Sequence, residues 1–261
     1  MRRPLLLTCL MALGAASAGA WPFSLMEALG RDARRVVPRS LGRLLASREA
    51  LIGEELKRFP PALSQALAVD FQTGHLQPET LAALEAELQA VVELLRTQRL
   101  GEGLVRLGAL LRIPADLADP VLTAGPEGFP PGVVREYYDF TQGSLGLIPV
   151  VLEDPPALKL DHRDLAAYWQ GLLDRSRVQS PVIRTELFRN GRLVDHRTVD
   201  YRSPVFGVAS ISYSRAVTGI AATWLVVWRE AHGDLTRMPP PREVRPRDEP
   251  PSTLETRSPP L

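Results

Sequence analysis

The chain has 261 residues, of which 45% are hydrophobic and 23% are charged, an ordinary balance for a globular protein that can bury a real core. Its 31 basic and 30 acidic residues give a formal net charge of +1, so the totals indicate no basic face for nucleic acid or acidic lipid.

Residues 1–20, "MRRPLLLTCLMALGAASAGA", have the layout of a secretory signal. Arg2 and Arg3 precede an apolar run, and small residues that end at Ala20 follow it as an A-x-A cleavage site. A membrane anchor is the alternative, but the run is shorter than the roughly 20 residues that a spanning helix needs. We therefore predict cleavage after Ala20 and export to the periplasm or beyond. Cleavage also removes Cys9, the only cysteine, which leaves no disulfide or thiol chemistry.

The first half of the mature chain has the periodicity of helices. Residues 40–59 place apolar side chains along one stripe, which opens at Ser40 as an N-cap and ends before Pro60. Residues 78–98 begin with Pro78 at a first-turn position and repeat apolar residues at helical spacing. Two amphipathic helices are therefore expected in this half.

The second half contains helices and one exception. Residues 133–142 and 161–177 predict two further helices. Residues 182–201 differ, because Asn190-Gly191 lies between two partly alternating runs, which is the signal of a β-hairpin. Residues 206–233 have an apolar face so wide that it predicts a buried core helix, and their uninterrupted apolar stretch is too short to span a membrane.

The fold class that follows is mainly α, with a single multi-helical domain over residues 21–237 and a possible short hairpin near 182–201. Residues 238–261 are rich in proline and charge and have almost nothing to bury, which predicts a disordered tail. No membrane-spanning segment is expected in the mature chain.

Local motifs assign no reaction. The histidines do not share the spacing of metal ligands on a helix, and they occur at His75, His162, His196 and His232. There is no G-x-S-x-G element and no glycine-rich phosphate loop. From these observations alone the chain is an exported helical protein.

One helical stretch stands out for its charges. Gly101 and Gly103 predict a break, after which "LVRLGALLRIPADLADPVL" begins as an apolar helix. It nevertheless carries Arg112 and Asp116 one helical turn apart, on either side of Pro114. Charged residues among apolar neighbours point to a site rather than to an ordinary core.

Three separated pieces resemble the zinc-dependent phospholipase C family, whose fold is shared with single-strand-specific nucleases. The first is Trp21, directly after the predicted cleavage site; in the family this residue ligates zinc through its free amino group and carbonyl. The second, "LGALLRIPADLADPVL", is similar to the family's H-x-x-x-D-x-x-x-P-L-H helix. Asp116 matches its aspartate, whereas Arg112 and Leu122 stand where the two histidines are expected. The third is "ISYSRAVTGIAATWLVVWREA", which resembles a closing helix that ends W-x-x-x-W.

A further piece, "VREYYDF", resembles the family's H-x-x-x-E ligand pair, with Arg135 at the histidine and Asp139 at the glutamate. The resemblance therefore implies a phospholipase C type of helical domain whose ligand set is reduced to Trp21, Asp116 and Asp139. His75 is a further candidate, although its spacing from Asp70 is not the family's. Because a zinc cluster needs several imidazoles and carboxylates, we expect no bound metal; zinc is the cofactor if the protein is active.

Arginines offer a substitute for the missing ions. A guanidinium can neutralise buried carboxylates that would otherwise be costly. We therefore expect Arg112 and Arg135 to balance Asp116 and Asp139 in a salt-bridge network, although Pro114 could disturb the helix between the first pair. The alternative is that all four side chains point to solvent.

Two classes of function follow. The first is a metal-poor pseudoenzyme that keeps the helical scaffold and acts by binding or as a structural protein. The second is a metal-dependent phosphodiester hydrolase, acting on phospholipid or nucleic acid, with one ion held by the reduced ligand set. The number of ligands favours the first class. The sequence names no partner; an exported protein would meet a lipid or another envelope component.

Overall fold

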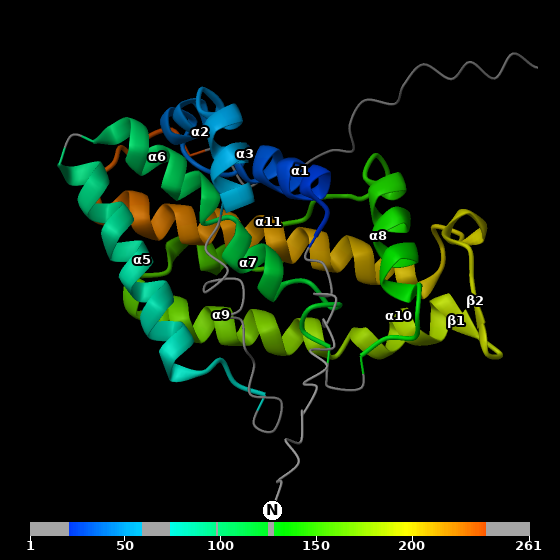
Figure 1. Ribbon diagram of the computed structural model, residues 1–261. Helices are drawn as coiled ribbons and strands as arrows, with labels where there is room; N and C mark the ends of the chain where they lie inside the picture. Colours follow the sequence, from blue (N-terminus) through cyan, green and yellow to red (C-terminus); the bar gives the residue numbers. More distant parts are fainter. Residues whose placement is uncertain (1–20, 59–73, 98, 125–127, 239–261) are drawn as a thin grey trace, which may run out of the picture.

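The computed structural model describes residues 21–58, 74–97, 99–124 and 128–238, and its described part is mainly helical, as the sequence predicts (Figure 1). The predicted signal and residues 239–261 of the predicted tail lie outside the described residues. The α-helices are α1 (Phe23–Ala33), α2 (Arg39–Ala46), α3 (Glu49–Arg58), α5 (Pro78–Arg96), α6 (Leu100–Ala109), α7 (Arg112–Leu117), α8 (Val133–Ser144), α9 (His162–Arg177), α10 (Ser180–Leu187) and α11 (Pro204–Glu230). Short 3₁₀ turns are η1 (Pro155–Lys159) and η2 (His196–Thr198), and the strands are β1 (Phe188–Arg189) and β2 (Arg192–Leu193).

The long helix α11 is the centre of the domain. It begins at Pro204 because the Ser203 hydroxyl accepts a hydrogen bond from the Phe206 amide and proline suits the first turn. The chain from Ser212 to Trp228 is buried except for the half-buried Arg215. Helices α1, α5, α7, α9 and α10 pack against it, with α1 on one side and α9 and α10 on the other (Figure 1). The predicted core helix is therefore confirmed.

By length and composition alone, α11 could also be a membrane-spanning helix. Within the described part of the chain it is the one helix long and apolar enough to cross a membrane, and 72% of its most apolar window is buried inside the domain. Burial by neighbouring helices on this scale is the pattern of a core helix.

Helix α7 lies unusually close to α11. A Cβ atom at Gly219 of α11 would stand 2.8 Å from the Cβ of Pro114 in α7, which is too close for a side chain. The glycine therefore allows the two backbones to approach each other. This contact fixes α7, the helix with the unexpected charges, against the centre of the domain.

Two helix boundaries differ from the sequence prediction. The expected helix over residues 40–59 is divided into α2 and α3, because the chain turns at Ser47, whose hydroxyl bonds to the Leu44 carbonyl at 2.7 Å. The expected break between α5 and α6 is present, but it lies between Arg96 and Leu100 and not at Gly101 and Gly103, which are both inside α6. The lack of a side chain at Gly103 makes room for Leu95 of α5, which would be 2.8 Å from a Cβ there.

The hairpin around Asn190-Gly191 is present but shorter than predicted. Both residues have positive φ angles, 52° and 74°, as a tight hairpin turn of this type requires. Phe188 pairs with Leu193 across the two antiparallel strands. The preceding residues 182–187 belong instead to α10, because Ile183 and Leu187, one helical turn apart, are both buried there.

Candidate functional site

A buried polar cluster joins α7 to α8. Arg112 Nε lies 3.2 Å from Asp116 Oδ2, one turn further along α7. Asp119, just after α7, accepts hydrogen bonds from the Val121 amide at 2.8 Å and from the Tyr138 hydroxyl of α8 at 2.7 Å. The exposed fraction is 2% for Asp116 and 0% for Asp119. The core of the domain therefore holds two carboxylates three residues apart in sequence, with one arginine in contact with Asp116.

Pro114 does not disturb this pair. Helix α7 begins at Arg112, so the proline is its third residue, at a position whose N–H would have no partner inside the helix. The chain turns earlier, at Leu110 and Leu111, between α6 and α7. Arg112 and Asp116 consequently lie on one intact helical turn.

Burial controls the charge of this cluster. Loss of solvent raises the pKa of Asp116 to about 7, against the opposing effect of Arg112. Burial likewise raises the pKa of Asp119 to about 7, although the hydrogen bonds from Tyr138 and from the Val121 amide oppose it. Further positive charge beside these carboxylates would therefore favour their ionised forms.

Trp21 lies against the same cluster. Its side chain is 3% exposed, and its indole Nε1 donates to the carbonyl of Ala115 in α7 at 2.9 Å. Its ring centroid is 6.2 Å from that of Tyr138. The side chain of Trp21 is thus fixed between α7, at the residue before Asp116, and Tyr138 of α8.

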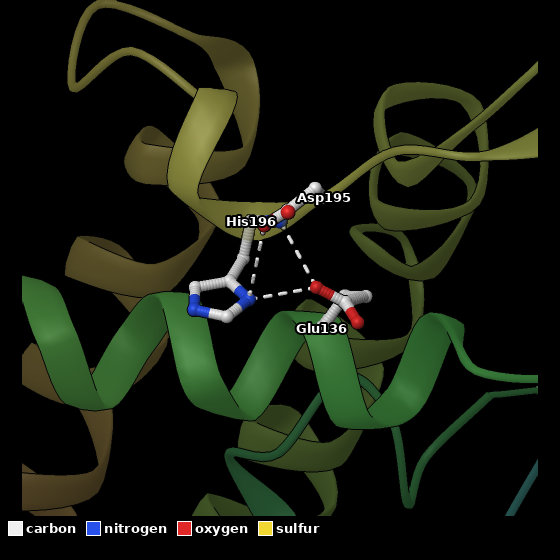
Figure 2. Close-up of side chains that lie close together, drawn as sticks. All are labelled: Glu136, Asp195 and His196. Carbon is white, nitrogen blue, oxygen red and sulfur yellow. Dashed lines mark hydrogen bonds and ion pairs between the residues drawn. The ribbon is translucent and has the colours of Figure 1, made fainter.

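A second group of polar side chains lies where α8 meets the segment after the hairpin. Glu136 Oε2 is 2.7 Å from His196 Nδ1 and 2.9 Å from the backbone N of His196, and both nitrogens donate to it (Figure 2). His196 Nδ1 is also 3.8 Å from Asp195 Oδ1. The other ring nitrogen of His196 points away from both carboxylates (Figure 2).

This second group lines an open pocket of about 490 Å³. The remaining lining side chains are Arg135, Asp139, Leu193 and Arg197. The backbone N–H and the ring of His196, together with Arg135, lower the pKa of Glu136 to about 2, so this carboxylate is ionised at neutral pH. We call this surface the α8–η2 pocket. Its charged, solvent-open lining suits a polar ligand or a metal ion.

The structure separates the residues that the family resemblance implies as metal ligands. Trp21 bonds through its indole to Ala115, the residue before Asp116 in α7. Asp139 is exposed and lines the α8–η2 pocket, and Arg135 pairs at 3.0 Å with Glu136, not with Asp139. His75 is exposed just before α5. The expected network of Arg112, Arg135, Asp116 and Asp139 is therefore divided between the buried cluster and the α8–η2 pocket.

Potential metal ligands do gather at one place. In the described ranges, the only group of three or more histidine, cysteine or acidic side chains with ligand atoms within 4.8 Å of one another consists of Glu136, Asp195 and His196. It contains none of the acidic or histidine residues expected from the sequence. His196 carries no local signal, because its partner lies sixty residues earlier in the chain; the turn at Asn190-Gly191 brings it back to α8.

Comparisons of the chain with protein-family models, with curated proteins and with solved structures find no significant match.

Proposed function

We propose that this protein is an exported, metal-poor relative of the phospholipase C type that acts by binding or as a structural protein and not by hydrolysis. The observation that carries the proposal is the ion pair between Arg112 and Asp116. A guanidinium stands where the family resemblance implies a zinc-ligating histidine, and it already supplies positive charge to the aspartate. A divalent cation brought to the same carboxylate would be repelled by that arginine about twice as strongly as a singly charged group at the same distance.

The α8–η2 pocket is the surface that we assign to ligand binding. It is open to solvent, and Arg135 and Arg197 extend into it, with side chains 72% and 78% exposed. Because the proposed location is the periplasm or the exterior, a lipid or another envelope component is the class of ligand to test first. Cosedimentation with vesicles of neutral and anionic phospholipid, compared between the native chain and Arg135→Ala, tests this assignment.

The second candidate is a metal-dependent phosphodiester hydrolase with a reduced metal site. A specific observation favours it, namely the clustering of Glu136, Asp195 and His196. The edges of a tetrahedral zinc site with bonds of about 2.0–2.1 Å are about 3.3 Å long, and His196 Nδ1 lies 2.7 Å and 3.8 Å from the two carboxylates. These two separations lie on either side of that length, and an ion held there would polarise a phosphoryl oxygen and acidify a bound water.

Competing cations weigh against this second candidate. Arg197 holds Asp195 through both side-chain oxygens, with Nη2 2.6 Å from Oδ2 and Nε 3.0 Å from Oδ1. Arg135 holds the other oxygen of Glu136 at 3.0 Å. A metal ion would have to displace or tolerate both arginines, which lowers its affinity.

Metal analysis and an activity assay separate the two candidates. The mature protein is purified without chelators, its metal content is measured by mass spectrometry, and hydrolysis of p-nitrophenylphosphorylcholine is followed with and without added zinc. We expect substoichiometric metal and no hydrolysis. Stoichiometric zinc, with hydrolysis that is lost in His196→Ala or Asp116→Asn and retained in the exposed control Asp161→Asn, would establish the hydrolase instead.

A further inference from the structure

The buried cluster beside Trp21 is short of positive charge. Asp116 and Asp119 are almost completely buried. Among the described residues, Arg112 forms an ion pair with Asp116, and no cationic side chain forms one with Asp119. Asp119 is instead held by two neutral donors. Buried carboxylates without matching cations are costly. The cluster therefore fits one more cation than its described side chains provide.

One carboxylate oxygen of the cluster lacks a donor. Asp116 Oδ2 accepts a hydrogen bond from Arg112 Nε, whereas Asp116 Oδ1 is buried and has no hydrogen-bond partner in the part of the chain that the structure describes. A buried oxygen in this state destabilises the folded protein, and more so if it is charged. Buried polar atoms are almost always paired, so an orphaned one calls for a donor.

Trp21 is tied to the turn of α7 that carries this oxygen. Its indole is bonded to Ala115, the residue before Asp116, and its ring packs near Tyr138, the partner of Asp119. The residue that follows is fixed too, because the carbonyl of Pro22 accepts hydrogen bonds from Leu25 and Met26 at the start of α1. Trp21 thus has little freedom to move away from α7.

We propose that hydrolysis of the Ala20–Trp21 bond creates the missing cation, and that the new α-ammonium group of Trp21 forms a buried ion pair with Asp116 Oδ1. One water molecule is consumed, its oxygen becomes part of the Ala20 carboxylate, and the freed Trp21 amine takes up a proton. Removal of the leader then completes the core, so that the processed chain is more stable than the precursor. This inference rests on the proposed export and cleavage, and not on the binding role of the α8–η2 pocket.

The experiment compares the exported chain with one that has a glycine inserted between Ala20 and Trp21. After cleavage, the insertion moves the ammonium group one residue away from Asp116 and leaves every other group in place. Intact mass verifies the N-terminus of each protein. Thermal unfolding at pH 7 in EDTA should then show a lower Tm for the glycine-extended chain by about 3–8 °C, because breaking a buried ion pair is strongly destabilising.

A second measurement is the rate at which the Trp21 α-amine reacts with an acylating reagent. At neutral pH an amine-reactive acylating reagent labels exposed α-amines, whose pKa is about 7.7–8.0, and the two lysines of the chain, Lys57 and Lys159, provide internal standards. Relative to Lys57, which is about half exposed, the Trp21 amine should react at least about tenfold more slowly than the terminal glycine amine, since burial and pairing suppress the free base. In Asp116→Asn the insertion should no longer change Tm.

Several results would overturn the inference. Equal Tm values, or equal labelling of the two amines, would mean that the ammonium group is not buried against Asp116. If the protein retains zinc and the zinc protects the Trp21 amine from labelling, the amine binds a metal ion and is not protonated. If the mass shows residues 1–20 still attached, the proposed processing is wrong. The ion pair is then tested by itself in a chain whose leader is replaced by a protease-removable tag that ends before Trp21.

Discussion

Arg112 and Asp116 lie one turn apart on α7, with arginine Nε 3.2 Å from an aspartate oxygen that is buried in the core. The guanidinium reaches this oxygen from the edge of the domain, since its side chain is 25% exposed. The arrangement allows a carboxylate to be ionised in an apolar surrounding.

Removing the arginine should destabilise the protein more than removing both partners. Arg112→Met leaves Asp116 without its cation, and we expect the free energy of unfolding to fall by about 2–4 kcal/mol. In the Arg112→Met/Asp116→Asn double variant the loss should be smaller, because no buried charge is left unpaired. Urea unfolding of the two single variants and the double variant measures the coupling; strict additivity would show that the two side chains do not interact.

Tyr138 should be needed for Asp119. In Tyr138→Phe the buried oxygen Oδ2 of Asp119 loses its hydroxyl donor, and the free energy of unfolding should fall by about 1–3 kcal/mol. Tyr201→Phe is the matched control, because Tyr201 is 60% exposed. Chemical denaturation of both variants checks this, and equal stabilities would contradict the role assigned to the Tyr138–Asp119 bond.

In a chain that has further residues before Trp21, the free energy of unfolding should depend on pH through the buried aspartates. Burial raises the pKa of Asp116 and Asp119 from 3.8 to about 7, so the folded state binds protons more tightly than the unfolded state. The free energy of unfolding should therefore decrease as the pH rises from 3.8 towards 7. Denaturation of the glycine-extended chain across this range tests the sign. The slope should be weaker when the Trp21 amine is free.

Glu136 should have the opposite effect on the pH dependence of stability, and at lower pH. Its pKa is lowered from 4.5 to about 2 by the His196 amide and ring and by Arg135, so stability should be lost as the pH falls through this window. Glu136→Gln, at neutral pH, should weaken the hold of α8 on the segment from Asp195 to Val199. Amide hydrogen exchange there should become about tenfold faster or more, whereas Glu102→Gln, an exposed control elsewhere, should leave it unchanged.

The close contact of α7 with α11 predicts opposite effects for two glycines of α11. Gly219→Ala places a methyl group 2.8 Å from Pro114, and we expect a loss of about 1–3 kcal/mol. A methyl group at Gly207 meets nothing within 4 Å, so Gly207→Ala should stabilise the helix by about 0.5–1 kcal/mol. Thermal unfolding distinguishes them; similar effects would mean that α7 and α11 are further apart.

Most helices could be predicted from the sequence because an amphipathic helix is a local pattern. The apolar face of α11 repeats along contiguous residues, and so does that of α5. The helix break at Ser47 was missed, since Ser47 competes for a backbone carbonyl without interrupting the apolar spacing. The glycines of α6 were misjudged because what they accommodate, Leu95 in the case of Gly103, lies on another helix.

The local sequence pattern is enough to predict the mainly helical architecture, the tight turn at Asn190-Gly191 and the one-turn spacing of Arg112 and Asp116, because all of these depend on neighbours a few residues apart. The contacts of Glu136 with His196 and of Tyr138 with Asp119 join residues far apart in the chain and could not be predicted from it. These contacts require α8 to be placed between α7 and the hairpin segment. That placement follows from packing around α11, which no short stretch of the chain encodes.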